Sequence, residues 1–124
     1  MATEADVRRI AMALPEVTEG EGRLGFAVAD KGFVWSWMER VVPKQPKVER
    51  RDVLAVRVAG ADDKQAMLTS DPEVYFTEPH YNGYPAVLVR LEAIELDELE
   101  DILLDAWRRC APKALVKAFD AANL

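Results

Sequence analysis

Residues 23–38, RLGFAVADKGFVWSWM, carry the pattern of two β-strands joined by a short turn. Successive side chains of a strand point to opposite faces, so alternate residues share a face. On the first strand, the apolar side chains that share a face are Leu24, Phe26 and Val28. On the second, the aromatic side chains that share a face are Phe33, Trp35 and Trp37. Between them Asp30-Lys31-Gly32 is typical of a tight turn in which Gly32 takes a positive φ, so the stretch predicts an antiparallel hairpin.

Further strands follow this hairpin along the chain. Three stretches rich in β-branched and other apolar side chains predict strands: residues 53–58, 74–77 and 86–91. Asn82-Gly83 lies between the last two and favours a hairpin turn. Residues 41–52 hold Pro43 and Pro46, which cannot donate to a strand ladder, so a loop or an irregular edge is expected there.

Helices are predicted from caps and from apolar periodicity. Thr3 begins a helix that ends at about Leu14 because Pro15 follows, and Asp6 completes a capping box with Thr3. Residues 16–22 are polar and are expected to form a loop. The other predicted helices are residues 62–69, with Asp62 and Gln65 as a capping box, residues 97–110, with Asp97 and Glu100 in the same roles, and a last helix opened by Pro112.

These elements predict the fold class. Strands joined by hairpins form antiparallel sheets, and amphipathic helices bury their apolar stripe against such a sheet. The expected fold is therefore α+β with two layers, an antiparallel β-sheet and helices packed on one of its faces. The 124 residues match the size of one domain, so a single domain over residues 1–124 is expected.

Composition narrows the classes of function. The chain is 50% hydrophobic and 31% charged, which is typical of a globular protein. It has one cysteine, Cys110, and no intramolecular disulfide can form, so a cytoplasmic location is expected. No signal peptide and no apolar run of membrane-spanning length is visible, so no membrane partner is expected. The net charge of −6 argues against non-specific binding to nucleic acid over the whole surface.

One segment departs from this acidic average. Residues 40–51 carry five cationic side chains and a single acid, Glu49. The cationic residues are Arg40, Lys44, Lys47, Arg50 and Arg51. They form the candidate nucleic-acid-binding site, because cationic side chains on a loop can meet successive phosphates. The alternative is a solvated loop whose charge only keeps the protein in solution.

Four other side chains are candidates for ligand binding or for stacking on bases. They are Trp35, Trp37, His80 and Tyr84. The alternatives are that both tryptophans belong to the core and that His80 only bonds the backbone of its turn. Either role is compatible with the sequence, because a strand exposes one face and buries the other.

The sequence contains no recognisable catalytic or metal-binding constellation. One histidine and one cysteine cannot supply the ligand sets of common zinc sites, so no metal and no cofactor are expected. Glu98, Asp101 and Asp105 lie at helical spacing, but carboxylates on a helix are usually solvated. No nucleophile is paired with His80, and the protein is expected not to be an enzyme.

Several segments resemble the MmcQ/YjbR-like family of small bacterial proteins. The matching stretches are DVRRIA (residues 6–11), LPE (14–16), DKGFVW (30–35), DPEVYFTEPHYNGYPAVLVRL (71–91), Ala106-Trp107 and Ala111-Pro112-Lys113. The resemblance spans nearly the whole chain in the same order. It implies a frataxin-like (CyaY-like) α+β fold with a double-wing shape, for which members are described as DNA-binding proteins. It carries over no catalytic residues.

Two hypotheses about function follow. The first is a non-enzymatic DNA-binding module that contacts phosphates through the basic loop. The second is an interaction domain for a small molecule or a protein, including a second copy of the chain in a homodimer, that uses the aromatic-rich hairpin. The position of the cationic side chains in the folded chain distinguishes them.

Overall fold

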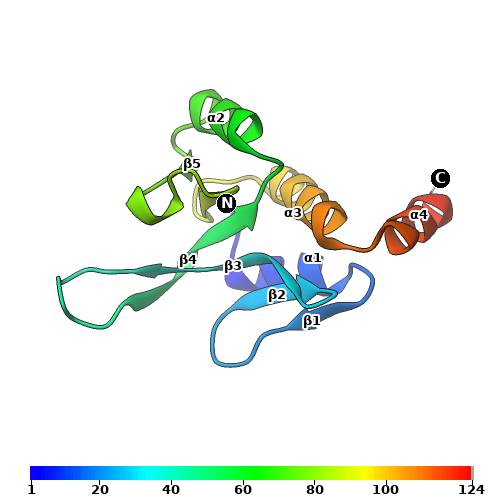
Figure 1. Cartoon of the computed structure of the whole chain (residues 1–124), viewed down its shortest axis with the longest axis horizontal. Coiled ribbons are helices and arrows are strands. Elements are labelled where there is room, and N and C mark those ends of the chain that lie inside the picture. Colours follow the sequence, from blue (N-terminus) through cyan, green and yellow to red (C-terminus); the bar gives the residue numbers. More distant parts are fainter. Residues whose placement is uncertain (124) are drawn as a thin grey trace.

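The computed structural model describes residues 1–123, and its strands form an antiparallel sheet in the order β1-β2-β3-β4-β6-β5 (Figure 1). The strands are β1 (Val17–Glu19), β2 (Gly25–Val28), β3 (Lys31–Glu39), β4 (Val48–Arg57), β5 (Tyr75–Phe76) and β6 (Ala86–Arg90). The helices are α1 (Glu4–Met12), α2 (Ala61–Ser70), α3 (Leu96–Cys110), α4 (Lys113–Ala122) and the short 3₁₀ helix η1 (Pro79–Tyr81). Every pair of neighbouring strands is antiparallel, as predicted.

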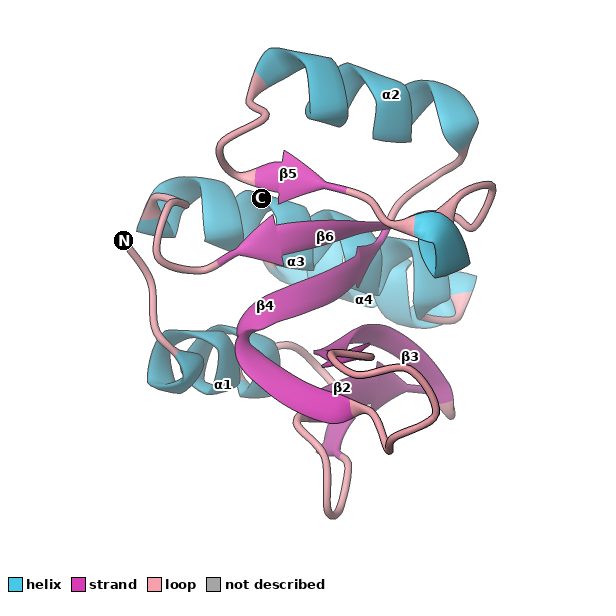
Figure 2. Cartoon of the chain, turned by 90° about the vertical axis from the view of Figure 1, so that its left-hand side faces the viewer, coloured by secondary structure: helices cyan, strands magenta, loops and turns pink. Residues whose placement is uncertain are grey.

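Helices cover one face of this sheet. Figure 2 shows α3 and α4 behind the strands, while α2 lies beside the edge strand β5. Leu99, Leu103 and Trp107 of α3 are fully buried in a core that also contains Val7 of α1. The indole Nε1 of Trp107 donates a hydrogen bond to the carbonyl of Pro15, 3.1 Å away, which satisfies its one polar atom. The predicted two-layer α+β fold is confirmed.

The hairpin of residues 23–38 forms with two differences from the prediction. Leu24, Phe26 and Val28 are buried together as expected. The turn, however, places Ala29 and Asp30 at positive φ, and Gly32 already lies within β3. Phe26 pairs with Val34 and Ala27 with Gly32, so Phe33 is the extra residue of a β-bulge. The bulge turns Phe33 into the helix-side core, so the prediction that it shares a face with Trp35 and Trp37 is wrong.

The sequence did not predict β1 or the first half of β4. β4 begins at Val48 instead of residue 53, and β1 occupies part of the predicted loop 16–22. Residues 17–19 and 48–52 are mostly polar and are exposed or half-buried. The apolar alternation that indicates a strand is therefore missing from both. The basic loop is consequently shorter than expected, and Arg50 and Arg51 belong to a strand.

Some of the turns and helix caps also differ from those predicted from the sequence. The capping box of Thr3 and Asp6 is confirmed. The N-caps of α2 and α3 are Gly60 and Glu95, and neither makes a side-chain cap, so the predicted capping boxes there are wrong. Residues 77–85, which include η1, connect β5 and β6, and no two-residue turn forms at Asn82-Gly83.

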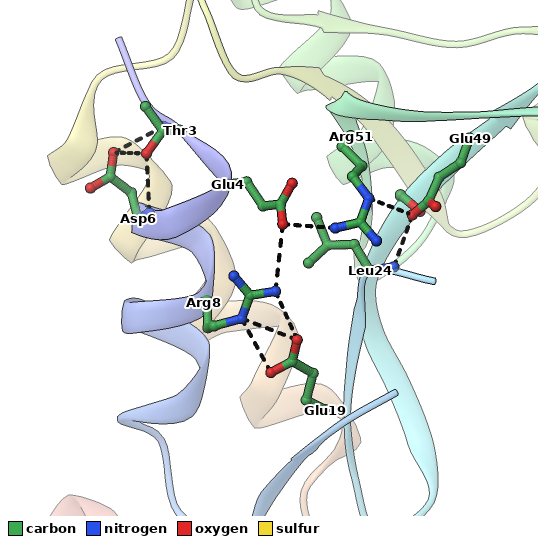
Figure 3. Close-up of polar contacts among 9 residues, drawn as sticks. Thr3, Glu4, Asp6, Arg8, Glu19, Leu24, Glu49 and Arg51 are labelled. Atoms are coloured by element: carbon green, nitrogen blue, oxygen red, sulfur yellow. Dashed lines mark hydrogen bonds and ion pairs between the residues drawn. The ribbon is translucent and has the colours of Figure 1, made fainter. Parts of the chain in front are cut away.

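A second bulge interrupts the pairing of β3 with β4. Ser36 lies opposite Leu54, but the next residue, Trp37, lies opposite Arg50. Near this bulge the carboxylate of Glu49 accepts hydrogen bonds from the backbone N–H of Leu24 at 2.9 Å and from the buried Ser36 hydroxyl at 2.7 Å. Figure 3 shows the bond to Leu24 beside a contact with Arg51. The Leu24 N–H lowers the pKa of Glu49 more than any other contact.

We predict that Glu49→Ala lowers the free energy of unfolding by about 1–3 kcal/mol, because it leaves two donors without an acceptor. Urea denaturation measures this change. Glu21→Ala is the matched control, since Glu21 is exposed and lies in a loop. Equal stability of the two variants would contradict the structural role of Glu49.

Acid should weaken the same junction. The pKa of Glu49 is lower in the folded chain than in the unfolded one, so its stabilisation is complete at neutral pH and is lost as the pH falls through the lowered pKa. We predict that the urea concentration at the unfolding midpoint decreases as the pH is lowered from about 5 to 3. This decrease should be less steep in Glu49→Gln. Glu21→Gln should follow the unsubstituted protein, and parallel profiles for all three proteins would refute the assignment.

Candidate functional site

The face of the sheet opposite the helices carries a cluster of aromatic side chains, which we call the aromatic face. Its members are Trp35, Trp37, Phe76, Tyr81 and Tyr84. The strand register places Trp35 opposite Ala55 of β4, Ala55 opposite Leu88 of β6, and Leu88 opposite Phe76. The buried side chains under the cluster, Val53, Ala55 and Leu88, form a hydrophobic layer separate from the main core. In Figure 2 no α-helix lies over the strands on this side.

The rings of the aromatic face hold one another in place. Trp35 meets Tyr84 edge-on at a centroid distance of 6.4 Å, and Tyr84 meets Tyr81 in the same way at 6.0 Å. Trp37 and Phe76 form a third perpendicular pair at 5.7 Å. These geometries are favourable for aromatic quadrupoles. The indole Nε1 of Trp35 donates to the hydroxyl of Tyr81 at 3.1 Å, so the polar edge of this indole is occupied.

Arginine side chains lie over the same rings. The guanidinium of Arg57 is 5.6 Å from the Trp35 ring and 6.0 Å from the Tyr84 ring, and that of Arg90 is 4.0 Å from the Phe76 ring. Backbone carbonyls hold both: Arg57 donates to Gly32 at 2.9 Å, and Arg90 donates to Pro72 and Glu73 at 3.3 Å each.

Carbonyl acceptors fix these guanidinium groups without neutralising them. Among residues 1–123, neither Arg57 nor Arg90 forms an ion pair with a carboxylate. A cation held over an aromatic ring is partly stabilised by the ring quadrupole and keeps its full charge for a further partner. The aromatic face therefore offers apolar stacking area and positive charge together.

A hollow of about 570 Å³ opens at one end of this face. Its lining residues are Arg23, Trp35, Met38, Lys47, Glu78, His80, Tyr81 and Tyr84. The fold thus brings together residues from both candidate sets of the sequence: Lys47 from the basic loop, and Trp35, His80 and Tyr84 from the ligand or stacking candidates. Trp37 belongs to the aromatic face but lies outside the lining of the hollow.

The rim of the hollow depends on a lysine that sequence reasoning missed. Lys64 of α2 is only 7% exposed, and its ammonium donates to the carbonyls of Tyr81 and of Tyr84, the latter at 3.0 Å. Burial lowers the pKa of Lys64. The lysine ties α2 to residues 81–84 and so positions two rings of the aromatic face. No motif marks it, because the signal is a contact between segments distant in sequence.

The five predicted phosphate contacts separate into two groups. Arg40, Lys44 and Lys47 lie in the loop after β3, where Arg40 donates to the Gln45 carbonyl at 2.7 Å. Within the described residues these three side chains make no ion pair. We call residues 40–47 the arm loop.

Arg50 and Arg51 differ, because both already have carboxylate partners. Arg50 contacts Glu39 at 2.6 Å and Asp52 at 2.9 Å. Arg51 contacts Glu4 of α1 at 2.7 Å and Glu49 at 3.5 Å (Figure 3). In Figure 3 Arg51 lies between α1 and the sheet, so it links the two layers. The structure therefore gives these two arginines partners within the protein itself.

Three further features concern metal binding, thiol reactivity and membrane insertion. Over residues 1–123, no group of three or more His, Cys, Asp or Glu side chains is placed to hold a metal ion. Cys110 is buried, and burial raises the pKa of its thiol, which opposes formation of the reactive thiolate. None of the described helices combines the length and the apolar character that a bilayer crossing requires.

Comparison with known proteins agrees with this architecture. The model of the YjbR family matches residues 12–109. Uncharacterised proteins of Mycobacterium tuberculosis (Rv2570) and Mycobacterium bovis (Mb2600) are each 40% identical to the chain over 125 residues, with 96% of both chains covered. The crystal structure of protein DR2400 of Deinococcus radiodurans, with domain DUF419, superposes with a TM-score of 0.65 at 18% identity, covering 95% of this chain and 88% of that chain.

The fold and the site define a small α+β protein whose sheet is covered by helices on one face and bears an aromatic, arginine-rich surface on the other. This chain belongs to the YjbR family, which confirms the resemblance seen in the sequence. The frataxin-like (CyaY-like) part of that expectation stays a prediction.

We predict that Lys64→Met loosens the rim of the hollow, because the carbonyls of Tyr81 and Tyr84 lose their donor. Hydrogen exchange of the amides of residues 81–84 should accelerate, and unfolding should need about 1–3 kcal/mol less. Lys117→Met, on the exposed surface of α4, is the matched control. Unchanged exchange at residues 81–84 would show that Lys64 does not position the rim.

Proposed function

We propose that this protein binds nucleic acid, without catalysing a reaction, through the aromatic face and the cations beside it. The observation that carries the proposal is the pairing of Arg57 and Arg90, neither engaged by a carboxylate of the described residues, with the rings of Trp35, Tyr84 and Phe76. Bases stack on exposed aromatic rings, and phosphates pair with arginine. One surface supplies both kinds of contact.

The net charge of −6 does not oppose this function once the charges are placed in the fold. Much of the acid is on the helix layer, where α3 carries Asp97, Glu98, Glu100, Asp101 and Asp105. The aromatic face lies on the other side of the sheet. A polyanion would be repelled from one layer and attracted to the other, so the uneven charge orients the protein on its ligand.

The arm loop extends the same surface. Figure 1 shows the β3–β4 hairpin projecting beyond the rest of the sheet. The loop at its tip carries Arg40, Lys44 and Lys47 together with exposed Val41 and Val42. In the proposal these cations contact the phosphate backbone beside the aromatic face. The unpaired Cys110 suits a reducing compartment, so the proposal places binding in the cytoplasm.

The aromatic face is also where the alternative function would reside. A small-molecule site is favoured by the hollow, whose volume of about 570 Å³ lies within the ordinary range for such sites. A homodimer would instead bury the aromatic rings against a second copy of the chain. The dimer hypothesis predicts that substitution of Trp37 changes the molecular mass in solution, and light scattering measures that mass.

We predict that the protein binds a fluorescent 15-nucleotide strand at low salt and that Arg57→Gln with Arg90→Gln weakens this binding at least tenfold. The slope of log affinity against log salt should fall by about 1.4, since each phosphate contact contributes roughly 0.7 on a single strand. Fluorescence anisotropy measures both quantities. Arg108→Gln with Arg109→Gln removes the same charge from the helix layer and should change neither.

A second pair of substitutions tests whether the arginines that already pair with carboxylates take part in binding. Arg50→Gln with Arg51→Gln should leave the salt slope nearly unchanged, because carboxylates of the protein already neutralise both side chains. A loss of slope equal to that of the Arg57 and Arg90 pair would place the interface at the start of β4, around Arg50 and Arg51, instead. Absence of binding at low salt would reject the proposed function.

A further inference from the structure

We propose that the hollow on the aromatic face takes one nucleotide unit, a flat heterocycle bearing a phosphate, and that the protein therefore prefers unpaired strands to duplexes. This inference rests on the proposed function and names the ligand of the same site more closely. In the bound state the base would lie against Trp35 and Tyr84, and the phosphate would lie at Arg23 and Lys47.

The apolar side of the hollow suits a flat ring. Trp35, Tyr81 and Tyr84 contribute three rings at nearly perpendicular angles, with interplanar angles of 79° and 85° between successive pairs. The hydrogen bond between Trp35 Nε1 and the Tyr81 hydroxyl satisfies the polar edge of the indole. Trp35 is half-buried, so the part that it offers a ligand is apolar ring surface. Tyr84 is 39% exposed, so part of its side chain is open to solvent.

The polar side of the hollow suits an anion joined to that ring. Arg23 and Lys47 are exposed, and within residues 1–123 neither pairs with a carboxylate. Arg23 donates to the Ser36 carbonyl at 3.2 Å, which orients it without removing its charge. An inorganic anion would leave the rings unused, and an apolar ligand would leave the two cations unused.

The remaining lining groups can bond the edge of a base. One carboxylate oxygen of Glu78 accepts from the His80 backbone N–H at 3.1 Å, which leaves its other oxygen available for the amino group of a heterocycle. The imidazole of His80 is exposed and can donate or accept. Aromatic walls, two cations and one acceptor together match a nucleotide better than they match either half of it.

This geometry selects unpaired nucleotides. In a duplex the faces of a base are stacked and its pairing edge is occupied, so the rings of the hollow can reach a base only when it is unpaired. The rim is also built in advance, because Lys64 already fixes the carbonyls of Tyr81 and Tyr84. A preformed site loses little entropy when it binds.

The test compares a 15-nucleotide thymidine strand, a 15-base-pair duplex and free AMP by fluorescence anisotropy, with AMP used as a competitor and also titrated alone by calorimetry. We expect the strand to bind at least tenfold more tightly than the duplex. Tyr84→Ala should weaken strand binding about tenfold and abolish the preference, whereas Tyr84→Phe, which keeps the ring, should retain both. Arg23→Gln with Lys47→Gln changes only exposed side chains and should weaken strand binding to a similar extent.

The outcomes separate the two proposals. If the duplex binds as well as the strand, and Tyr84→Ala has no effect while Arg57→Gln with Arg90→Gln weakens binding, the hollow is rejected and the proposed function stands. If only AMP binds, and Tyr84→Ala abolishes this binding, the nucleotide site stands, its ligand is a free nucleotide and the proposed function is rejected. If neither nucleic acid nor AMP binds, both proposals are rejected.

Discussion

The carboxylate of Glu49 supplies a hydrogen-bond acceptor where the sheet backbone provides none. The bulge between β3 and β4 shifts the register from Leu54 to Arg50, and Glu49 supplies the acceptor for the Leu24 N–H and the Ser36 hydroxyl. A bulge bends and twists the strands that carry it, and here the β3–β4 hairpin projects beyond the sheet (Figure 1). The arm loop, and Lys47 at the hollow, therefore depend on one acid whose role is structural.

The distribution of charge explains how an acidic protein can present a cationic surface. Arg51 lies between Glu4 and Glu49, and Arg50 lies between Glu39 and Asp52, so these arginines hold elements together. Arg57 and Arg90 are held instead by carbonyls, which orient a guanidinium but leave it charged. A count of charges along the chain treats these arginines alike. Only the acceptor that each one meets in the fold separates them.

Sequence periodicity predicted the regular strands and helices and missed the features that depend on pairing between strands. The alternation in residues 23–38 predicted the first hairpin, and the stripe of α3 predicted the helix that covers the sheet, because both patterns reflect burial on one side. The bulge that turns Phe33 inward and the polar half of β4 depend on pairing between strands, which leaves no periodic signal. The candidate site was predicted in part: Trp35, Lys47, His80 and Tyr84 were named, but Lys64 and Arg23 act through contacts between distant segments.

The lengths of the outermost strands carry a consequence for self-association. A long free strand edge can pair with strands from other molecules, and an aromatic sheet face can stack on another sheet. Together these two features favour the growth of fibrils. Here the two edges are β1, with three residues, and β5, with two. Such short outermost strands expose few unpaired backbone groups, so strand addition at these two borders gains few hydrogen bonds. At these two borders, short strands therefore discourage amyloid-like polymerisation of a sheet that carries aromatic rings on one face.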